Sequence, residues 1–226
     1  MGTMRDPLKG FDWCTLYRRY DDQCLRFDPT SVFLSSFESD RPATDRTLYY
    51  QLLNLFSEGG RTSIIDPLGR YEALLYWKLY SQRTAPHNLR EWLRKDESKR
   101  TGAKERLLRL LQELPISLER SPSSIVERVK WLGKFQLPGM ASPSTLPIRT
   151  TFLHFLYPTV VPIFDQMVLK AVGAWAKGAN HKTSVLNEYL PFAWELAESY
   201  AQRVSSFTKE GTIRVIDMAL WVSRGN

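Results

Sequence analysis

The apolar residues of this 226-residue chain recur almost throughout with the 3.6-residue period of an α-helix. In the segment LLRLLQEL, for example, Leu107, Leu111 and Leu114 fall on one face of a helix. The segments TLYYQLLNLF, DPLGRYEALLYWKLYSQ, AWELAESYAQRV and TIRVIDMALWV have the same pattern. Strand signals are weak, because long alternation of apolar and polar residues and the Asn-Gly and Asp-Gly hairpin turns are missing. The sequence therefore predicts an all-α protein of about eight to ten helices.

Three of these helices carry start signals, namely Thr44 or Asp45, Asp66-Pro67 and Ser121-Pro122. In the helix after Pro67, Lys78 shares a face with the apolar Tyr71 and Leu74. We expect residues 1–226 to form a single compact helical unit. A finer division into two lobes, about residues 41–120 and 121–226 with a cleft between them, is also compatible with the pattern, and residues 1–40 carry weaker signals.

The net charge of the chain, +7 from 31 Lys and Arg against 24 Asp and Glu, favours an anionic partner such as nucleic acid. The segment from Arg83 to Arg109 contains nine basic residues and four acidic ones. A solvated pair of helices is one explanation of this segment. A phosphate-binding surface is the other, and its candidate residues are Arg94, Lys95, Lys99 and Arg100.

Other classes of protein are disfavoured by the composition. Cys14 and Cys24 are too few for a disulfide scaffold, and the N-terminus lacks the apolar core of a signal peptide. No stretch has the roughly 18 uncharged apolar residues of a membrane span. We therefore expect a cytoplasmic protein without membrane contact. His87, His154 and His181 are isolated, so no metal and no cofactor are predicted, and a structural histidine is favoured at His154.

The segment from Leu137 to Gly173 contains the candidate chemistry. The turn LPGM, Leu137 to Met140, can present backbone N–H groups to a phosphate, and Pro147 fits the first turn of the helix that follows. Asp165 comes after the apolar loop TVVPIF and begins another helix. An ordinary N-cap explains an Asp at this place. A catalytic carboxylate explains it as well, because the apolar flanks would desolvate the group if it faced a cleft.

The order of these motifs resembles the helix-hairpin-helix DNA glycosylase superfamily. In that family a hairpin close to LPGVG-x-x-TA is followed by VD-x-x-V, and here LPGM and PIFDQMV stand in those places. LPIRTTFLHFLYP and PIFDQMVLKAVG, with WKLYSQ and VIDMALWV elsewhere, are similar to an uncharacterised, divergent branch of it. The resemblance is specific over roughly residues 120–175. It implies a multi-helix glycosylase-like fold, with the hairpin followed by an aspartate-bearing loop.

The resemblance also implies functional roles. Asp165 would be the catalytic aspartate that stabilises a cationic sugar, and Leu137, Pro138, Gly139 and Met140 would hold a phosphate of double-stranded DNA from which the target base is flipped. Two features depart from the family pattern. Met140-Ala141-Ser142 stands where a second glycine is usual, and Lys134 precedes the turn instead of following it. Without the lyase lysine and the cluster-binding cysteines of some members, a monofunctional, hydrolytic glycosylase of DNA repair is implied.

Three hypotheses remain open at this point. The first is an enzyme that hydrolyses the N-glycosidic bond of a damaged or mismatched base. The second is a non-catalytic helical module that holds nucleic acid, either DNA or RNA, on the same scaffold. The third is a helical protein-interaction domain whose basic face is incidental. The oligomeric state is not indicated by the sequence.

Overall fold

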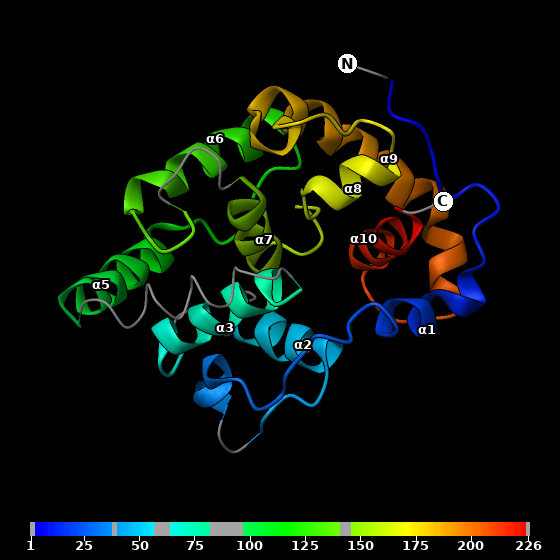
Figure 1. Ribbon diagram of the computed structural model, residues 1–226. Helices are drawn as coiled ribbons and strands as arrows, with labels where there is room; N and C mark the ends of the chain where they lie inside the picture. The colour runs from blue at the N-terminus through cyan, green and yellow to red at the C-terminus, as the bar shows by residue number, and fades with distance from the viewer. Residues whose placement is uncertain (1–2, 38–39, 57–63, 82–96, 141–145, 225–226) are drawn as a thin grey trace.

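The computed structural model describes residues 3–37, 40–56, 64–81, 97–140 and 146–224, and for residues 97–101 it describes the backbone alone. Within these ranges the regular structure is entirely helical and contains no strand, which confirms the predicted all-α class (Figure 1). The α-helices are α1 (Leu16–Asp21), α2 (Asp45–Phe56), α3 (Pro67–Leu79), α5 (Glu97–Glu113), α6 (Pro122–Leu132), α7 (Leu146–Leu156), α8 (Gln166–Ala171), α9 (Thr183–Ser205) and α10 (Thr212–Ser223). Short 3₁₀ helices are η1 (Trp13–Thr15), η2 (Val32–Phe37), η3 (Gly133–Phe135) and η5 (Ala179–His181).

The predicted start signals cap the helices as expected. The hydroxyl of Thr44 accepts a hydrogen bond from the Thr47 amide at 3.1 Å at the start of α2. At the start of α3, Asp66 accepts one from the Gly69 amide at 3.2 Å. Ser121 does the same for α6. These side chains satisfy amides that the helix itself leaves without a partner, which fixes where each helix begins.

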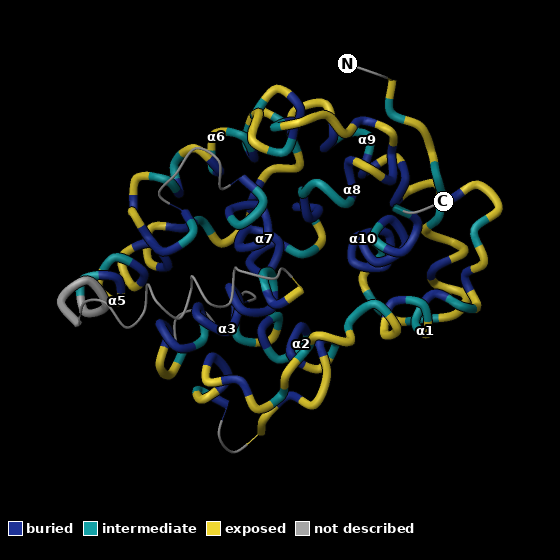
Figure 2. Tube along the Cα trace, in the orientation of Figure 1, coloured by how far each residue is buried: buried dark blue, intermediate teal, exposed yellow. Residues whose placement is uncertain are grey.

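Helix α7 lies at the centre of the molecule (Figure 1). It packs against α2, α3 and α6, and residues 149–157 are all buried (Figure 2). Phe152 and Phe155 are inaccessible to solvent, and each contributes about 2–3 kcal/mol of hydrophobic stabilisation. The hydroxyl of Thr151 donates to the Pro147 carbonyl at 2.7 Å, so this buried polar side chain is satisfied within the helix itself.

His154 is buried on α7 and both of its ring nitrogens have partners. Its Nδ1 lies 2.7 Å from the Val161 carbonyl oxygen, and its Nε2 lies 2.8 Å from the Tyr49 hydroxyl. Nδ1 must therefore carry the hydrogen and Nε2 must accept the one from Tyr49. Burial, with the charges of Arg214 and Lys78, lowers the pKa of His154 to about 3, so the ring is neutral. His154 is the structural histidine that the sequence favoured.

The N-terminal segment is divided between two parts of the molecule. Helix α1 packs against α10, and Arg19 donates to the Val222 carbonyl at 3.2 Å. By contrast, η2 packs against α3. Helix α7, which belongs to residues 121–226, packs against α2 and α3, which belong to residues 41–120. These two groups of helices are therefore in direct contact, and the division into lobes stays a prediction.

The LPGM turn connects η3 to the segment before α7. The Met140 amide donates to the Leu137 carbonyl at 2.9 Å, and Gly139 has a φ of +69°. A Cβ at Gly139 would lie 2.8 Å from Cδ1 of Ile148 on α7. Glycine is thus required here both by the backbone conformation and by the close approach of α7.

Polar contacts anchor this turn from two sides. The Tyr71 hydroxyl of α3 donates to the Pro138 carbonyl at 2.5 Å. From α7, the Arg149 guanidinium donates to the Met140 carbonyl at 2.9 Å through Nε, and to the Val129 carbonyl of α6 at 3.3 Å. The turn is therefore held against the core, and Arg149 of α7 links it to α6.

Candidate functional site

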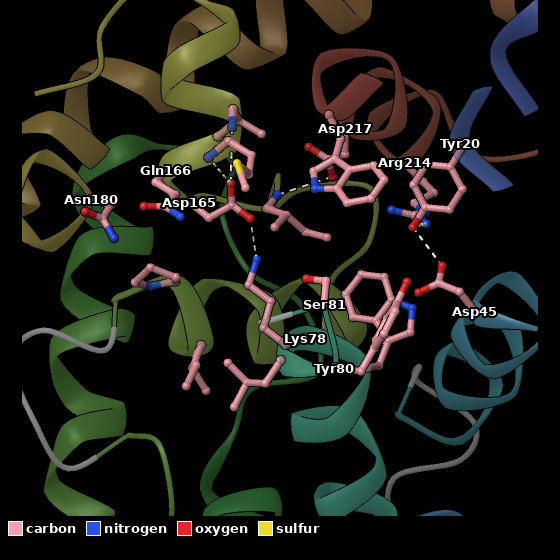
Figure 3. Close-up of a pocket in the computed structure, with 18 of the residues that line it drawn as sticks. Tyr20, Asp45, Lys78, Tyr80, Ser81, Asp165, Gln166, Asn180, Arg214 and Asp217 are labelled. Atoms are coloured by element: carbon pink, nitrogen blue, oxygen red, sulfur yellow. Dashed lines mark hydrogen bonds and ion pairs between the residues drawn. The ribbon is translucent and has the colours of Figure 1, made fainter. Parts of the chain in front are cut away.

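A cavity of about 400 Å³ lies between α3, α7, α8 and α10, and this is the candidate active site (Figure 3). Its size falls within the usual range of small-molecule pockets, roughly 300–1,000 Å³. Its wall contains charged groups from two of these helices, α3 and α10, and from the starts of α2 and α8. The polar residues that line it are Tyr20, Asp45, Lys78, Tyr80, Ser81, Asp165, Gln166, Asn180, His181, Arg214 and Asp217.

Asp165 is the N-cap of α8 and also lines the cavity, so the cap position leaves its carboxylate at the cavity, and the catalytic role stays a prediction. Its Oδ1 accepts hydrogen bonds from the Met167 and Val168 amides at 2.7 and 3.1 Å. The apolar residues that follow, Val168 and Leu169, anchor α8 in the core. The helix start therefore occupies one carboxylate oxygen and leaves the other directed away from the helix.

The other oxygen, Oδ2, accepts a hydrogen bond from Nζ of Lys78 at 2.7 Å, in an ion pair between α8 and α3. Asp165 retains 18% of its side-chain exposure and Lys78 9%, so the pair meets the cavity at its edge. Burial alone would raise the pKa of Asp165, but the charge and hydrogen bond of Lys78 and the two amides outweigh it and lower the pKa. Asp165 is therefore a carboxylate at neutral pH.

Lys78 was not predicted as a site residue. Its position on the buried face of α3 was nevertheless visible in the sequence, because it shares that face with Tyr71 and Leu74, both of which are inaccessible. A lysine on a buried face needs a partner for its charge. The missing information was the partner, which lies 87 residues away in the chain.

A second polar cluster forms the opposite side of the cavity. The Arg214 guanidinium donates to the Tyr20 hydroxyl at 2.8 Å, and this hydroxyl donates to Asp45 at 2.7 Å. The guanidinium also lies over the rings of Tyr49 and Trp77, 4.3 and 5.3 Å from their centroids. Burial raises the pKa of Asp45, while Arg214 and Tyr20 partly offset this effect. The cluster ties α1, α2 and α10 together around a buried cation.

Asp217 lies one turn after Arg214 on α10 and is the second acid whose side chain is deeply buried at the cavity. Its Oδ2 accepts a hydrogen bond from the Ile163 amide at 3.3 Å. Burial raises the pKa of Asp217 to about 8, with Arg214 acting in the opposite direction. Arg214, Asp217 and Trp221 are spaced at i, i+3 and i+7, so polar residues within the apolar segment TIRVIDMALWV were a signal of this site.

The predicted phosphate-binding turn does not line the cavity. Leu137, Pro138 and Met140 are buried and Gly139 is half-buried, and the Met140 amide is used within the turn. Ile148, whose side chain a Cβ at Gly139 would meet, forms part of the cavity wall. Of the predicted basic residues, Arg94 and Lys95 lie outside the described residues, as do the side chains of Lys99 and Arg100.

An open basic groove lies beside the cavity. Three exposed lysines line it, Lys130 and Lys134 near the end of α6 and Lys182 at the start of α9, and we call it the lysine groove. The other residues along it are Gly133, Gln136, Leu146, Arg149, His181, Thr183 and Ser184, so none of its lining residues is acidic. His181 lines both the groove and the cavity, which makes the two spaces adjacent.

Within the described ranges, His, Cys, Asp and Glu side chains do not gather in groups of three or more that a metal ion could use. Within the same part of the chain, no helix has both the length and the apolar character needed to cross a membrane.

The chain was compared with models of protein families, with curated proteins and with solved structures, and none of them matches it.

Proposed function

We propose that this protein binds double-stranded DNA and hydrolyses the N-glycosidic bond of a damaged or mismatched base. In this proposal the fold is a divergent form of the helix-hairpin-helix glycosylase architecture, and Asp165 is the carboxylate that stabilises the cationic sugar in the transition state. The base, flipped out of the duplex, would enter the cavity between α3, α7, α8 and α10.

The observation that carries the proposal is the state and position of Asp165. An ionised carboxylate is held at the edge of a 400 Å³ cavity, and its orientation is fixed by two backbone amides and a lysine. A carboxylate that is ionised before the substrate arrives can stabilise positive charge at C1′ without first losing a proton. The sequence order of α6, the LPGM turn, α7 and Asp165 supports the same conclusion.

The lysine groove supports the nucleic-acid part of the proposal. Lys130, Lys134 and Lys182 lie along one open surface, and their flexible side chains suit the phosphates of a polynucleotide backbone. Because His181 borders both spaces, a duplex held in the groove would place its bases next to the entrance of the cavity. The LPGM turn, being buried and anchored, would support this surface mainly by fixing α6 against α7.

The test is a screen of duplexes that each contain one uracil, hypoxanthine, 8-oxoguanine or alkylated base, with alkali-labile sites as the readout. Asp165→Asn should abolish product formation while the protein keeps its fold, because asparagine is also a good N-cap. Asp66→Asn is the matched control, since Asp66 is also a helix N-cap, accepting a hydrogen bond from the Gly69 amide, and does not line the cavity. Equal activity of wild type and Asp165→Asn would remove Asp165 from the mechanism.

A second candidate function is a nucleic-acid-binding module that cleaves no bond. It is favoured by the ion pair with Lys78, which already neutralises the one carboxylate oxygen that the helix start leaves free. In this case the protein binds DNA with a strong dependence on salt, and no substrate in the screen yields product. Binding would be weakened by reversing Lys130, Lys134 and Lys182 to Glu.

The matched control for this triple variant reverses three exposed basic residues outside the groove, Lys9, Arg203 and Lys209. Fluorescence anisotropy with labelled duplex at several salt concentrations measures both variants. The groove variant should lower the slope of log K against log salt by about 2 to 3, because each lost phosphate contact accounts for about 0.9 of it. If both triple variants weaken binding equally, the lysine groove is not the binding surface.

A further inference from the structure

Three carboxyl groups line the cavity: Asp45, which accepts a hydrogen bond from Tyr20 beside Arg214, and two further groups from different helices. Asp165 stands at the start of α8, and Asp217 extends from α10 (Figure 3). They are linked through the loop before α8, because Asp217 binds the amide of Ile163, two residues before Asp165. The Ile163 amide is the hydrogen-bond donor to Asp217 within the described residues. The other carboxyl oxygen of Asp217, Oδ1, can therefore interact with a molecule in the cavity.

The two groups have opposite environments. Asp165 has the Lys78 ammonium at 2.7 Å and two amides, all of which favour the carboxylate form. Asp217 is 4% exposed and receives one long hydrogen bond. Burial raises the pKa of Asp217 to about 8; Arg214 and Lys78 act against this and Asp165 reinforces it. Tyr49 of α2 and Tyr189 of α9 also face Asp217, and burial raises the pKa of each, so both stay neutral.

We propose that Asp217 is the general acid of this cavity and donates a proton to the departing base while Asp165 stabilises the sugar cation. This inference rests on the proposed function. A pair of carboxyl groups held in different protonation states within one site is a suitable arrangement for cleaving a glycosidic bond, since one group must give a proton while the other remains charged.

The reaction balances as follows. The bond between C1′ and the base nitrogen breaks, its electron pair stays with the base, and the proton of Asp217 neutralises the base. Water attacks C1′, its oxygen forms the new bond, and one of its protons passes to Asp165 and from there to solvent. Asp217 then takes up a proton from solvent. One water molecule is consumed, and the products are the free base and a hydroxyl group at C1′.

The test compares two substrates that differ in their need for an acid. Hypoxanthine leaves well only when it is protonated, whereas 7-methylguanine already carries a positive charge and leaves as a neutral base. Asp217→Asn should slow release of hypoxanthine from a duplex by about 100-fold or more relative to its effect on release of 7-methylguanine. Asparagine can still accept the Ile163 hydrogen bond, and circular dichroism checks the fold.

The wild-type protein supplies a second measurement that does not depend on any variant. Its rate of hypoxanthine release should fall as the pH rises above about 8, where Asp217 loses its proton, and the rate for 7-methylguanine should not. Equal slowing of both substrates by Asp217→Asn, an unchanged rate for both, or a wild type that releases 7-methylguanine alone would overturn the acid role. A wild type that releases no base at all refutes the proposed function itself, which is a separate outcome.

Discussion

The raised pKa of Asp217 predicts a pH-dependent stability difference that needs no substrate. In the folded protein burial raises this pKa from 3.8 to about 8. The folded state then binds one more proton than the unfolded state between these two values. Its stability contribution is fully present below pH 3.8 and is lost as the pH rises toward 8. Asp217→Asn removes this dependence.

The magnitude follows from the slope of about 1.4 kcal/mol per pH unit for one proton. Between pH 5 and pH 7, wild type should lose about 2 to 3 kcal/mol of unfolding free energy relative to Asp217→Asn. Chemical denaturation at both pH values, followed by circular dichroism, measures the difference. The unfolding free energy of the variant minus that of wild type should therefore be larger at pH 7 than at pH 5.

Asp165→Asn is the matched control within the same cavity. The pKa of Asp165 is lowered, so its contribution is present above 3.8 and is lost only as the pH falls below that value. Between pH 5 and pH 7 this variant should change the stability by a constant amount. If the unfolding free energies of wild type and Asp217→Asn changed in parallel between pH 5 and pH 7, Asp217 would already be ionised at pH 5. That result would refute the reasoning about its burial.

Three further substitutions test the surroundings of the cavity by denaturant unfolding. Lys78→Met leaves Asp165 without its cation, so this variant should lower the free energy of unfolding by about 1–3 kcal/mol. Carboxyl NMR should also show a raised pKa for Asp165, and an unchanged pKa would contradict the ion pair. Gly139→Ala should lower the free energy of unfolding by about 1–3 kcal/mol, because Gly139 has a positive φ and the Ile148 side chain packs against it. An unchanged free energy of unfolding would argue against this turn. Tyr49→Phe should lower the free energy of unfolding by about 1–2 kcal/mol, because Nε2 of His154 loses its buried hydrogen-bond donor. An unchanged free energy of unfolding would show that water or another group replaces the Tyr49 hydroxyl.

The helices themselves were predictable because their signals are local. Apolar periodicity and capping residues such as Asp66 and Ser121 lie within one turn of the structure that they specify. The N-cap position of Asp165 was found in the same way, from the apolar residues that follow it in α8. Such signals say nothing about contacts between helices, which is why the elements around the site were predicted more fully than the site itself.

The contacts of the cavity join residues far apart in the chain. The sequence placed Lys78 on a buried face but gave no means of pairing it with Asp165. Likewise, Lys130 and Lys134 of the lysine groove are completed by Lys182, which a local charge count cannot associate with them. The charge excess near Arg100 drew attention to another segment, whose side chains lie outside the described residues. Tertiary packing therefore decides which charges act together.

The hairpin shows how packing changes the meaning of a correct local prediction. LPGM does form a turn with glycine at the position of positive φ. The prediction that its amides face a phosphate assumed an exposed turn, whereas Tyr71 and Arg149 bind its carbonyl groups and hold it against α3 and α7. Side chains far from the motif therefore limit how much of its backbone can reach a ligand.

The ion pair of Asp165 with Lys78 supplies a test that separates the two candidate functions. Helix α8 occupies Oδ1 through two amides, so only Oδ2 can approach a sugar, and Oδ2 is in contact with Lys78. An enzyme must therefore let C1′ approach this oxygen beside the lysine or move the lysine aside. A flexible four-carbon side chain at the edge of a cavity can move in this way, whereas the two amides of the helix start cannot. Catalysis requires one of these two arrangements and simple binding requires neither, so the positions of Lys78 and C1′ relative to Oδ2 of Asp165 with DNA bound are the structural observation that separates an enzyme from a binding module.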